Sequence, residues 1–254
     1  MAILITGGTK GIGHAIAKRL ATAKNLSQKG ENIFLIYRSD NTAALDAKST
    51  LEAQGATVHL VKADVGTIEG AQAIHNAVAA NGATLTGIVH AAAMIYPTNL
   101  LEADLTKFKQ AVETNGLSLL YLVQKLLPTM DRGTSIVFIS SMGARIPSPF
   151  YGALGVGKAV AETILRYLVT ELAPKGIRIN AVAPGLVETS SVANMVGSEE
   201  AAQRVFEKAA KTNPSGRLSK DSDYASLVEY LLTPDAEFIQ GQVIAATGGV
   251  GVIG

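Results

Sequence analysis

Short apolar runs alternate with longer amphipathic segments along this chain. The runs are rich in Ile and Val, which predicts strands, at residues 3–6, 33–37, 58–62, 87–91, 135–140, 177–182 and 242–246. The segments between them have helical apolar spacing, which predicts helices at residues 12–23, 43–54, 69–80, 105–127, 160–173 and 221–232. Alternating strands and helices are typical of right-handed βαβ crossovers. The pattern therefore predicts the α/β class, with a parallel sheet that helices cover on both faces.

One long segment, residues 185–219, holds no predicted strand. Long segments of this kind in a compact domain are commonly functional, and this one is predicted to be a substrate lid over a pocket. The sequence contains no internal repeat, low-complexity tract or interdomain linker. Residues 1–254 are therefore expected to form one domain.

Composition narrows the function before any motif is considered. The 254 residues are 48% apolar, carry a net charge of +1 and include no cysteine. A charge so close to neutral does not favour nucleic acid or an anionic membrane, and the four His residues show no metal-ligand spacing. Without cysteine there is no disulfide framework and no thiolate nucleophile. We expect a small-molecule substrate, no metal, and chemistry from a cofactor or from hydroxyl, amine and carboxylate groups.

The N-terminal residues and the hydropathy predict a soluble, cytoplasmic protein. The first apolar run has no basic leader and soon meets Gly7 and Gly8, which indicates a strand rather than a signal peptide. No apolar stretch reaches the roughly 18 to 20 residues that cross a bilayer.

The first predicted strand leads into a glycine-rich turn that opens a helix. Glycines let the backbone approach a pyrophosphate, and the helix N-terminus offers unpaired N–H groups and the positive end of a dipole. A glycine cluster alone also suits a tight turn, but its place between a strand and a helix favours dinucleotide binding. The predicted contacts here are Gly7, Thr9, Lys10, Gly11, Ile12 and Gly13.

The second predicted strand ends at Tyr37-Arg38-Ser39, where an NAD-binding fold usually has an acid against the ribose 2′-hydroxyl. Arg38 suits a 2′-phosphate instead, because guanidinium and phosphate form forked, charge-assisted hydrogen bonds. Lys10 adds a second cation, so NADPH is the predicted cofactor; the alternative is that both cations are solvated, with Asp40 close by. The further contacts predicted for the adenosine half are Ser39, Asp64 and Val65. Asp64 in this place is also typical of a helix cap.

The glycine-rich turn is the first of several motifs in a fixed order. They are Thr6-Gly7-Gly8-x-x-Gly11-x-Gly13, Asn115 within a long helix, Ser141 after a strand, Lys158, Asn180-Ala-Val-Ala-Pro184-Gly185 and Thr189. Together they resemble the short-chain dehydrogenase/reductase superfamily over essentially the whole chain. The resemblance implies a doubly wound parallel (Rossmann) sheet of about seven strands in a single NADP-binding reductase domain, and a homotetramer or homodimer. It also implies cofactor contacts at Ala91, Lys158, Pro184, Gly185, Val187 and Thr189, the last two beside the nicotinamide carboxamide.

Two positions depart from the family's common pattern. Residues 90–93, His-Ala-Ala-Ala, stand where most members have Asn-Asn-Ala-Gly, so bracing at this strand end is expected to be weaker. The common catalytic pattern has Tyr four residues before Lys, but that position is Leu154, and the nearest Tyr is Tyr151, seven residues before Lys158. The stretch after Lys158 keeps the family spacing and fixes the register. A Tyr-x6-Lys arrangement resembles the enoyl-acyl-carrier-protein reductases, especially type III.

The longer spacing changes where the phenol reaches. Separations of four and seven residues span about 6 and 10.5 Å of helix, and both keep Tyr and Lys on one face. Pro147 and Pro149 predict that Tyr151 opens the helix rather than lying inside it. In ketone reduction the proton goes to the oxygen beside the carbon that receives hydride. In conjugate reduction charge appears on a carbonyl oxygen two bonds further away, which fits a donor displaced along the helix.

These considerations assign catalytic roles to Tyr151, Lys158, Asn115 and Ser141. Tyr151 is expected to hydrogen-bond a thioester oxygen and stabilise the enolate. Lys158 is expected to bind the nicotinamide ribose and to favour tyrosinate, Asn115 to hold a water molecule, and Ser141 to orient the substrate. The alternatives are a packed aromatic for Tyr151, a strand-end cap for Ser141, a satisfied helix-interior amide for Asn115 and a surface lysine for Lys158.

The predicted function is NADPH-dependent reduction of a carbon–carbon double bond conjugated to a thioester carbonyl, in fatty-acid or polyketide biosynthesis. Two alternatives stay open: a ketone or cyclic-enone reductase of the same family, and a non-catalytic NADP-binding protein. Residues 199–220 hold five Lys or Arg against three Glu, a slight excess that suits acyl carrier protein as a partner but is also typical of a solvated face. The predicted helices 105–127 and 160–173 are expected to form a symmetric four-helix contact between subunits.

Overall fold

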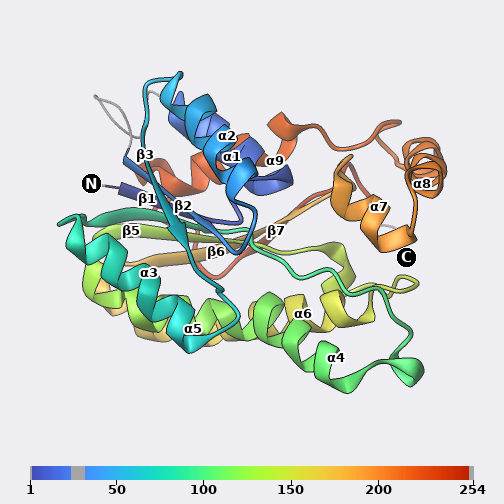
Figure 1. Ribbon diagram of the computed structural model, residues 1–254, viewed down its shortest axis with the longest axis horizontal. Coiled ribbons are helices and arrows are strands. Elements are labelled where there is room, and N and C mark those ends of the chain that lie inside the picture. The colour runs from blue at the N-terminus through green and yellow to red at the C-terminus, as the bar shows by residue number, and fades with distance from the viewer. Residues whose placement is uncertain (1, 24–31, 252–254) are drawn as a thin grey trace.

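The computed structural model describes residues 2–23 and 32–251 of the chain. Its strands form a single parallel sheet of seven strands in the order β3-β2-β1-β4-β5-β6-β7. The strands are β1 (Ala2–Thr6), β2 (Asn32–Tyr37), β3 (Thr57–Lys62), β4 (Leu85–His90), β5 (Met130–Ile139), β6 (Arg178–Pro184) and β7 (Val243–Ala246). The predicted doubly wound fold is confirmed, because helices cover both faces of this sheet (Figure 1).

The helices form a layer on each face of the sheet (Figure 1). One layer holds α1 (Gly11–Ala21), α2 (Asn41–Glu52) and α9 (Asp221–Leu232). The other layer holds α3 (Ile68–Ala80), α4 (Leu105–Val112), α5 (Ser118–Leu126) and α6 (Gly152–Leu172). Among the described residues, no helix combines the length and the apolar composition needed to span a membrane.

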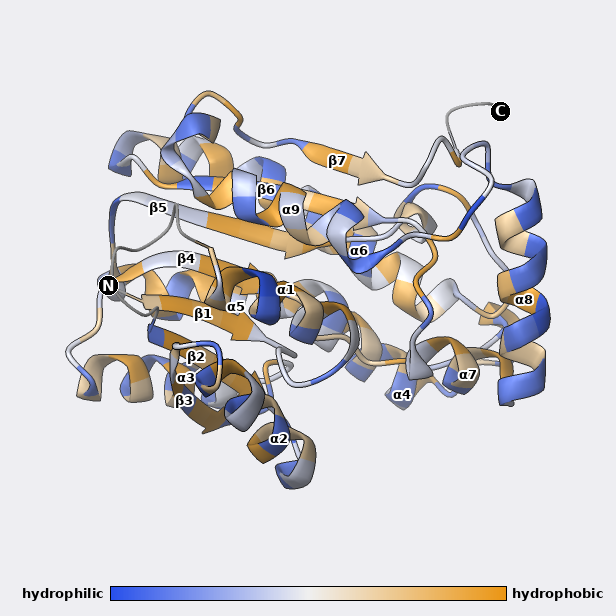
Figure 2. Cartoon of the chain, turned by 90° about the horizontal axis from the view of Figure 1, so that it is seen from above, coloured by the Kyte–Doolittle hydropathy of each residue, from blue (hydrophilic) through white to orange (hydrophobic). Residues whose placement is uncertain are grey.

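Two apolar cores separate the sheet from these layers. Successive residues of one strand serve opposite cores: Ile3 and Ile5 pack on the α1 and α9 side, whereas Leu4 packs on the α3, α5 and α6 side. The strands are accordingly apolar along most of their length (Figure 2). Burial on both faces explains why they stand out in the sequence as continuous apolar runs.

Residues 185–219 lie beyond the carboxyl ends of the strands and contain no strand, as predicted. They form α7 (Ser190–Val196) and α8 (Glu199–Thr212), which lie together at one end of the molecule (Figure 1). Ala193, Ala202 and Phe206 give these helices a small apolar core of their own. The chain order of the strands reverses between β1 and β4, where open α/β sheets bind ligands at the carboxyl edge.

The structure corrects two helix predictions, one in its continuity and one in its start. The predicted helix 105–127 is divided by a π-helical turn, Glu113–Leu117, where the Ser118 N–H donates to the Glu113 carbonyl five residues back. The predicted helix 160–173 begins at Gly152 instead. Glycine lowers intrinsic helix propensity, but close packing overrides it here, because a methyl group on Gly155 would lie 2.5 Å from the Gly143 carbonyl oxygen.

Candidate active site

The carboxyl end of β1 meets the glycine-rich turn predicted to hold a pyrophosphate. Gly7 and Gly11 have φ angles of 64° and 50°, in the left-handed region that favours glycine. A methyl group on Gly7 would lie 2.8 Å from the Ala92 Cα, and one on Gly13 would overlap the Gly7 carbonyl. The first turn of α1 carries no acidic side chain, so its N–H groups and dipole suit an anion. The turn therefore fits the phosphates of a dinucleotide.

The segment after β6 lies over this turn. Gly185, just past Pro184, donates its N–H to the Ala246 carbonyl at 2.8 Å, and Val187 is buried. Thr189 is the N-cap of α7, and its methyl group lies 3.6 Å from the position of a Cβ on Gly11. The structure thus brings the predicted contacts after β6 to the same crevice as the glycine-rich turn, where Thr9 and Ile12 are half-buried.

The end of β2 presents the residues predicted to choose the cofactor. Arg38 and Ser39 are exposed there. The Lys10 ammonium bonds the Asp40 carboxylate, which also caps α2 by accepting the Ala43 N–H at 3.0 Å. The hydrogen bond from Lys10 lowers the pKa of Asp40. Lys10 is therefore shared with an acid, and Arg38 is the stronger candidate for a 2′-phosphate.

The loop after β3 carries the residues predicted near the adenine. Asp64 accepts the Gly66 N–H at 2.9 Å, and Val65 is buried. The N-cap of the following helix is Thr67, which accepts the Gly70 N–H at 2.9 Å, so the cap alternative for Asp64 is wrong. Ala91, the residue after β4, donates its N–H to the carbonyl of Thr6, the last residue of β1, at 3.2 Å.

Tyr151 and Ser141 form a hydroxyl pair next to the crevice. Tyr151 occupies the N-cap of α6, as the two prolines predicted, and its phenol donates to Ser141 Oγ at 3.0 Å. Ser141 Oγ also accepts the Gly143 N–H at 3.1 Å, so its capping role and its contact with Tyr151 coexist. Burial raises the pKa of Tyr151, and the hydrogen bond with Ser141 only partly offsets this. The structure therefore favours a protonated phenol over the expected tyrosinate.

The backbone before Tyr151 is strained. Among the residues the structure describes, Phe150 is the one non-glycine residue with positive φ, at 60°. Such a conformation costs on the order of 1 to 3 kcal/mol and persists only where the surroundings hold it. The Thr98 N–H donates to the Phe150 carbonyl at 3.1 Å, and Leu154, at the family's usual Tyr position, is buried. Sequence reasoning missed the pairing of Thr98 with Phe150, because no local pattern connects two distant loops.

Lys158 is buried beneath the site and is not a surface lysine. Its side chain is 4% exposed; Nζ donates to the Ile139 carbonyl at 2.6 Å and lies 4.4 Å from the centre of the Phe138 ring. Burial lowers the pKa of Lys158 to about 7. Tyr151 and Lys158 lie at the N-cap and in the second turn of the same helix, as predicted.

Asn115 lies in the π-helical turn and fixes a neighbouring loop. Its Oδ1 accepts the Met94 N–H at 2.8 Å, and its Nδ2 donates to the Met94 carbonyl at 2.9 Å. The side-chain amide is thus bonded at both its oxygen and its nitrogen to the backbone of Met94. A methyl group on Gly157 would lie 2.6 Å from the Asn115 Cβ, so this glycine permits the π-helical turn to approach α6 beside Lys158.

Two further buried groups were missed by sequence reasoning. His90 bonds Thr6 Oγ1 through Nδ1 at 2.6 Å and Ser118 Oγ through Nε2 at 2.7 Å, so a histidine braces this strand end where most members of the family have Asn. Glu162 accepts from Ser140 Oγ at 2.6 Å and from Arg145 Nε at 3.2 Å. The spacing of Glu162, four residues after Lys158 on the same helix face, was the available signal.

The parallel sheet, the glycine-rich turn and the Tyr151 and Lys158 face of α6 define a nicotinamide-dependent oxidoreductase of the short-chain dehydrogenase/reductase superfamily. Residues 7–251 match the family described as Enoyl-(Acyl carrier protein) reductase, and the chain belongs to it.

Similar proteins span nearly the whole chain. The 1-cyclohexenylcarbonyl-CoA reductase of Streptomyces collinus is 29% identical over 98% of this chain and 86% of its own length. The enoyl-[acyl-carrier-protein] reductase (NADH) of Aquifex aeolicus VF5 is similar in structure, with a TM-score of 0.85, 27% identity and coverage of 100% of this chain and 97% of that one. The angucycline C-6 ketoreductase LanV, solved with bound NADP, has a TM-score of 0.86, 26% identity and coverage of 99% and 95%.

Proposed function

We propose that this protein is an NADPH-dependent enoyl-thioester reductase. The observation that carries the proposal is the Tyr151 phenol at the N-cap of α6, bonded to Ser141, with Leu154 buried at the family's usual tyrosine position. The similarity to a reductase of an unsaturated CoA thioester and to an enoyl reductase supports it.

The residues of the site divide the reaction between them. NADPH, once bound, would supply a hydride, and with it two electrons, for the β-carbon. Tyr151 hydrogen-bonds the thioester oxygen as negative charge moves onto it, once the hydrogen bond that Tyr151 shares with Ser141 reverses so that Ser141 donates to Tyr151. The α-carbon then takes a proton from the side of the site that holds Tyr151, which leaves a saturated thioester. Solvent replaces this proton. Because Tyr151 and Ser141 share one hydrogen bond, one of their two hydroxyl protons stays available to the substrate.

The other residues hold the cofactor. The glycine-rich turn would bind the pyrophosphate, Arg38 the 2′-phosphate and Lys158 the ribose of the nicotinamide half. Arg38→Ala should therefore weaken NADPH binding far more than NADH binding, measured by the fluorescence of each reduced cofactor on titration. An equal loss for both cofactors would contradict the role of Arg38. Arg132→Ala, at an exposed arginine near the amino end of β5, is the matched control, since it removes the same charge away from the carboxyl edge of the sheet.

Apolar side chains around Tyr151 suit an acyl group. Leu100, Ile146 and Phe150 are large and more than two-fifths exposed. Leu100 lies against Gly152, where an added Cβ would be 2.8 Å from its Cδ2. Exposed apolar groups next to a polar pair are typical of a site that takes an apolar substrate with one polar end.

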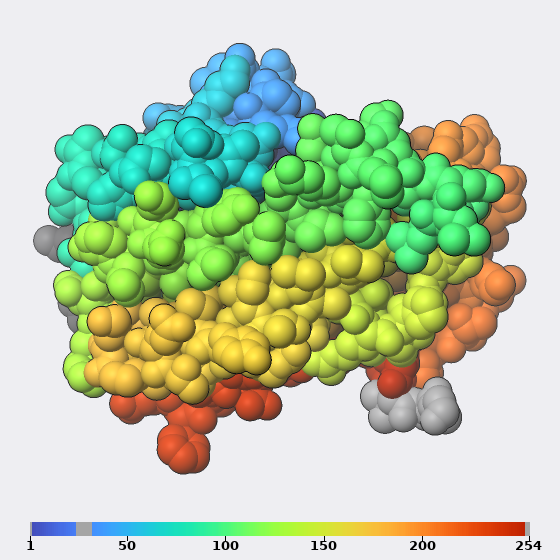
Figure 3. All heavy atoms as spheres, turned by 90° about the horizontal axis from the view of Figure 1, so that it is seen from below, coloured from blue at the N-terminus to red at the C-terminus, as the bar shows by residue number. Residues whose placement is uncertain are grey.

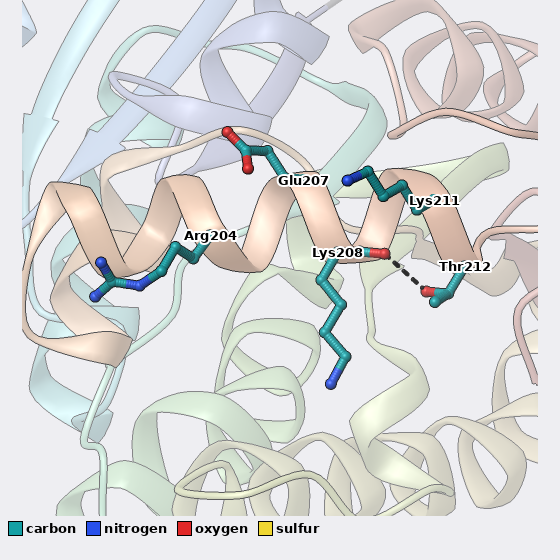
Figure 4. A pocket seen from close by; sticks show the side chains of 5 residues that line it. All are labelled: Arg204, Glu207, Lys208, Lys211 and Thr212. Atoms are coloured by element: carbon teal, nitrogen blue, oxygen red, sulfur yellow. Dashed lines mark hydrogen bonds between the residues drawn. The ribbon is translucent and has the colours of Figure 1, made fainter.

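The face of α8 suits an acidic carrier protein. An open pocket there is lined by Arg204, Glu207, Lys208, Lys211 and Thr212, and Arg204 and Lys208 extend on one side of the helix (Figure 4). Positive rim charges chiefly steer association. Lys208→Glu should raise KM for crotonyl-acyl carrier protein and leave KM for crotonyl-CoA unchanged. An unchanged KM for both substrates would remove the carrier protein from the proposal.

The central test compares two thioesters and one substitution. NADPH oxidation is measured with crotonyl-CoA and with acetoacetyl-CoA, the latter because the similarity to LanV makes ketone reduction the second candidate. Crotonyl-CoA should be the better substrate, and Tyr151→Phe should lower kcat by roughly 10² to 10³-fold with NADPH binding retained. Tyr167→Phe, an exposed tyrosine on the same helix, is the control. A preference for acetoacetyl-CoA, or wild-type turnover by Tyr151→Phe, would refute the proposal.

A further inference from the structure

His90 is fully buried at the carboxyl end of β4 and bonded at both ring nitrogens. Nδ1 lies 2.6 Å from Thr6 Oγ1, on the neighbouring strand, and Nε2 lies 2.7 Å from Ser118 Oγ, the first residue of α5. Thr6 and His90 face each other in the register of β1 and β4. The imidazole therefore joins the end of the cofactor-binding strand to the end of the π-helical turn.

The hydrogen bonds of this cluster allow one proton arrangement. Ser118 Oγ donates its single proton to the Thr114 carbonyl at 2.7 Å, so it must accept from His90 Nε2–H. A neutral imidazole then accepts at Nδ1 from the Thr6 hydroxyl, which in turn accepts the Ala92 N–H at 3.1 Å. Burial, with a smaller contribution from the charge of Lys158, lowers the pKa of His90 to about 3, so the ring stays neutral at physiological pH.

The hydrogen bonds that link Ala92, Thr6, His90, Ser118 and Thr114 form a relay, and both of its ends act on the same short segment, residues 91–94. At one end, the Ala92 N–H is held by Thr6. At the other end, the Ser118 N–H bonds the Glu113 carbonyl in the π-helical turn, so it does not bond the Thr114 carbonyl as it would in an α-helix. The Ser118 hydroxyl donates to the Thr114 carbonyl in its place. The turn so stabilised carries Asn115, which clamps Met94 at both its N–H and its carbonyl. Residues 91–94 are thus fixed at both ends, at the point where the strand order reverses.

We propose that His90 is a positioning residue for hydride transfer, holding residues 91–94 and the π-helical turn in a fixed relation to the nicotinamide end of the cofactor site. It touches neither substrate nor reacting atoms and acts through Thr6, Ser118 and the segment that they fix. The inference needs only the nicotinamide chemistry of the family, so it holds whichever thioester is reduced.

Three variants separate positioning from simple packing. His90→Phe keeps a planar ring and removes both nitrogens. His90→Asn replaces the ring by a carboxamide, which is too short to reach both partners and preserves one bond. Ser118→Ala breaks the relay at one point with the smallest change in volume and serves if His90→Phe does not fold. His75→Phe, on α3 outside the relay, is the matched control.

Each folded variant is assayed for kcat, for NADPH affinity and for the kinetic isotope effect with NADPH deuterated at the transferred position. His90→Phe should lower kcat by roughly 10²-fold, as a displacement near 1 Å does, with a larger isotope effect and nearly unchanged NADPH affinity. His90→Asn should lie between His90→Phe and wild type. A folded His90→Phe, or Ser118→Ala in its place, with wild-type kcat and isotope effect would overturn the proposal.

Nitrogen NMR of the wild-type enzyme tests the relay without any substrate. His90 should show only the Nε2–H tautomer from about pH 5 to about pH 9, whereas a solvated histidine titrates near 6.5. A protonated ring or the Nδ1–H tautomer would overturn the inference. A wild-type enzyme inactive on both thioesters, but with a pure Nε2–H ring, would refute the enoyl-reductase proposal and leave the relay standing.

Discussion

Replacing Lys158 by Met should stabilise the folded protein near neutral pH and abolish turnover. The ammonium is buried against one carbonyl and one aromatic ring, and burial lowers the pKa of Lys158 from 10.5 to about 7. Between these two pH values the unfolded chain binds a proton that the folded chain does not, so stability rises with pH. Below about pH 7 both states are protonated and the whole cost of the buried charge is present.

The size of the effect follows from the same values. At about 1.36 kcal/mol per pKa unit, a fall from 10.5 to about 7 corresponds to about 5 kcal/mol. Met has a similar length and no charge, but it leaves the Ile139 carbonyl without the Lys158 hydrogen bond, at a cost of about 1 to 3 kcal/mol. The expected net gain for Lys158→Met near pH 6.5 is therefore roughly 2 to 4 kcal/mol, falling by about 1.4 kcal/mol for each pH unit above 7.

The assay is urea unfolding of both proteins across about pH 6.5 to about pH 9.5, at one protein concentration and without cofactor. Other titrating groups are common to both proteins and cancel in the difference. Lys107→Met, at an exposed lysine on α4, is the control variant. A difference that stays flat with pH for Lys158→Met would mean that Lys158 keeps an ordinary pKa in the folded state and that the burial argument fails.

Three further results are expected. A methyl group on Gly143 would overlap the Tyr151 ring, so Gly143→Ala should cut kcat by roughly 10²-fold in steady-state assays with little change in NADPH affinity. Arg178 donates three hydrogen bonds to carbonyls around the C-terminal end of α9, so Arg178→Met should lower the urea-derived free energy of unfolding by about 2 to 4 kcal/mol. The open face formed by α4, α5 and α6 (Figure 3) carries the exposed apolar residues Leu120 and Tyr167, so light scattering should find a dimer or tetramer, and Tyr167→Glu should shift it toward monomer.

The sheet could be predicted from the sequence because the signal for each strand lies within the strand itself. Strands buried on both faces must be apolar along their length, and two prolines placed Tyr151 at a helix start. The π-helical turn left no such trace, because Glu113–Leu117 is compatible with ordinary helix and the bond that exploits the turn joins residues 21 apart. The apolar spacing, by contrast, placed the start of α6 too late, at residue 160. Its glycines argue against helix locally, and only packing against Gly143 and Asn115 requires them.

The two departures from the family's common pattern lie on either side of the π-helical turn, which explains how one site tolerates both. His90 braces the turn from β4, while Gly157 lets the turn press against α6 one residue before Lys158. Lys158 is held by the Ile139 carbonyl and the Phe138 ring, without a tyrosine one helical turn away, where the buried Leu154 lies instead. The phenol is held by the strained Phe150 and by Ser141, apart from the contacts that hold the lysine. Because separate contacts hold the two groups, the proposed proton donor can lie further along the helix while the proposed cofactor-binding lysine keeps its place.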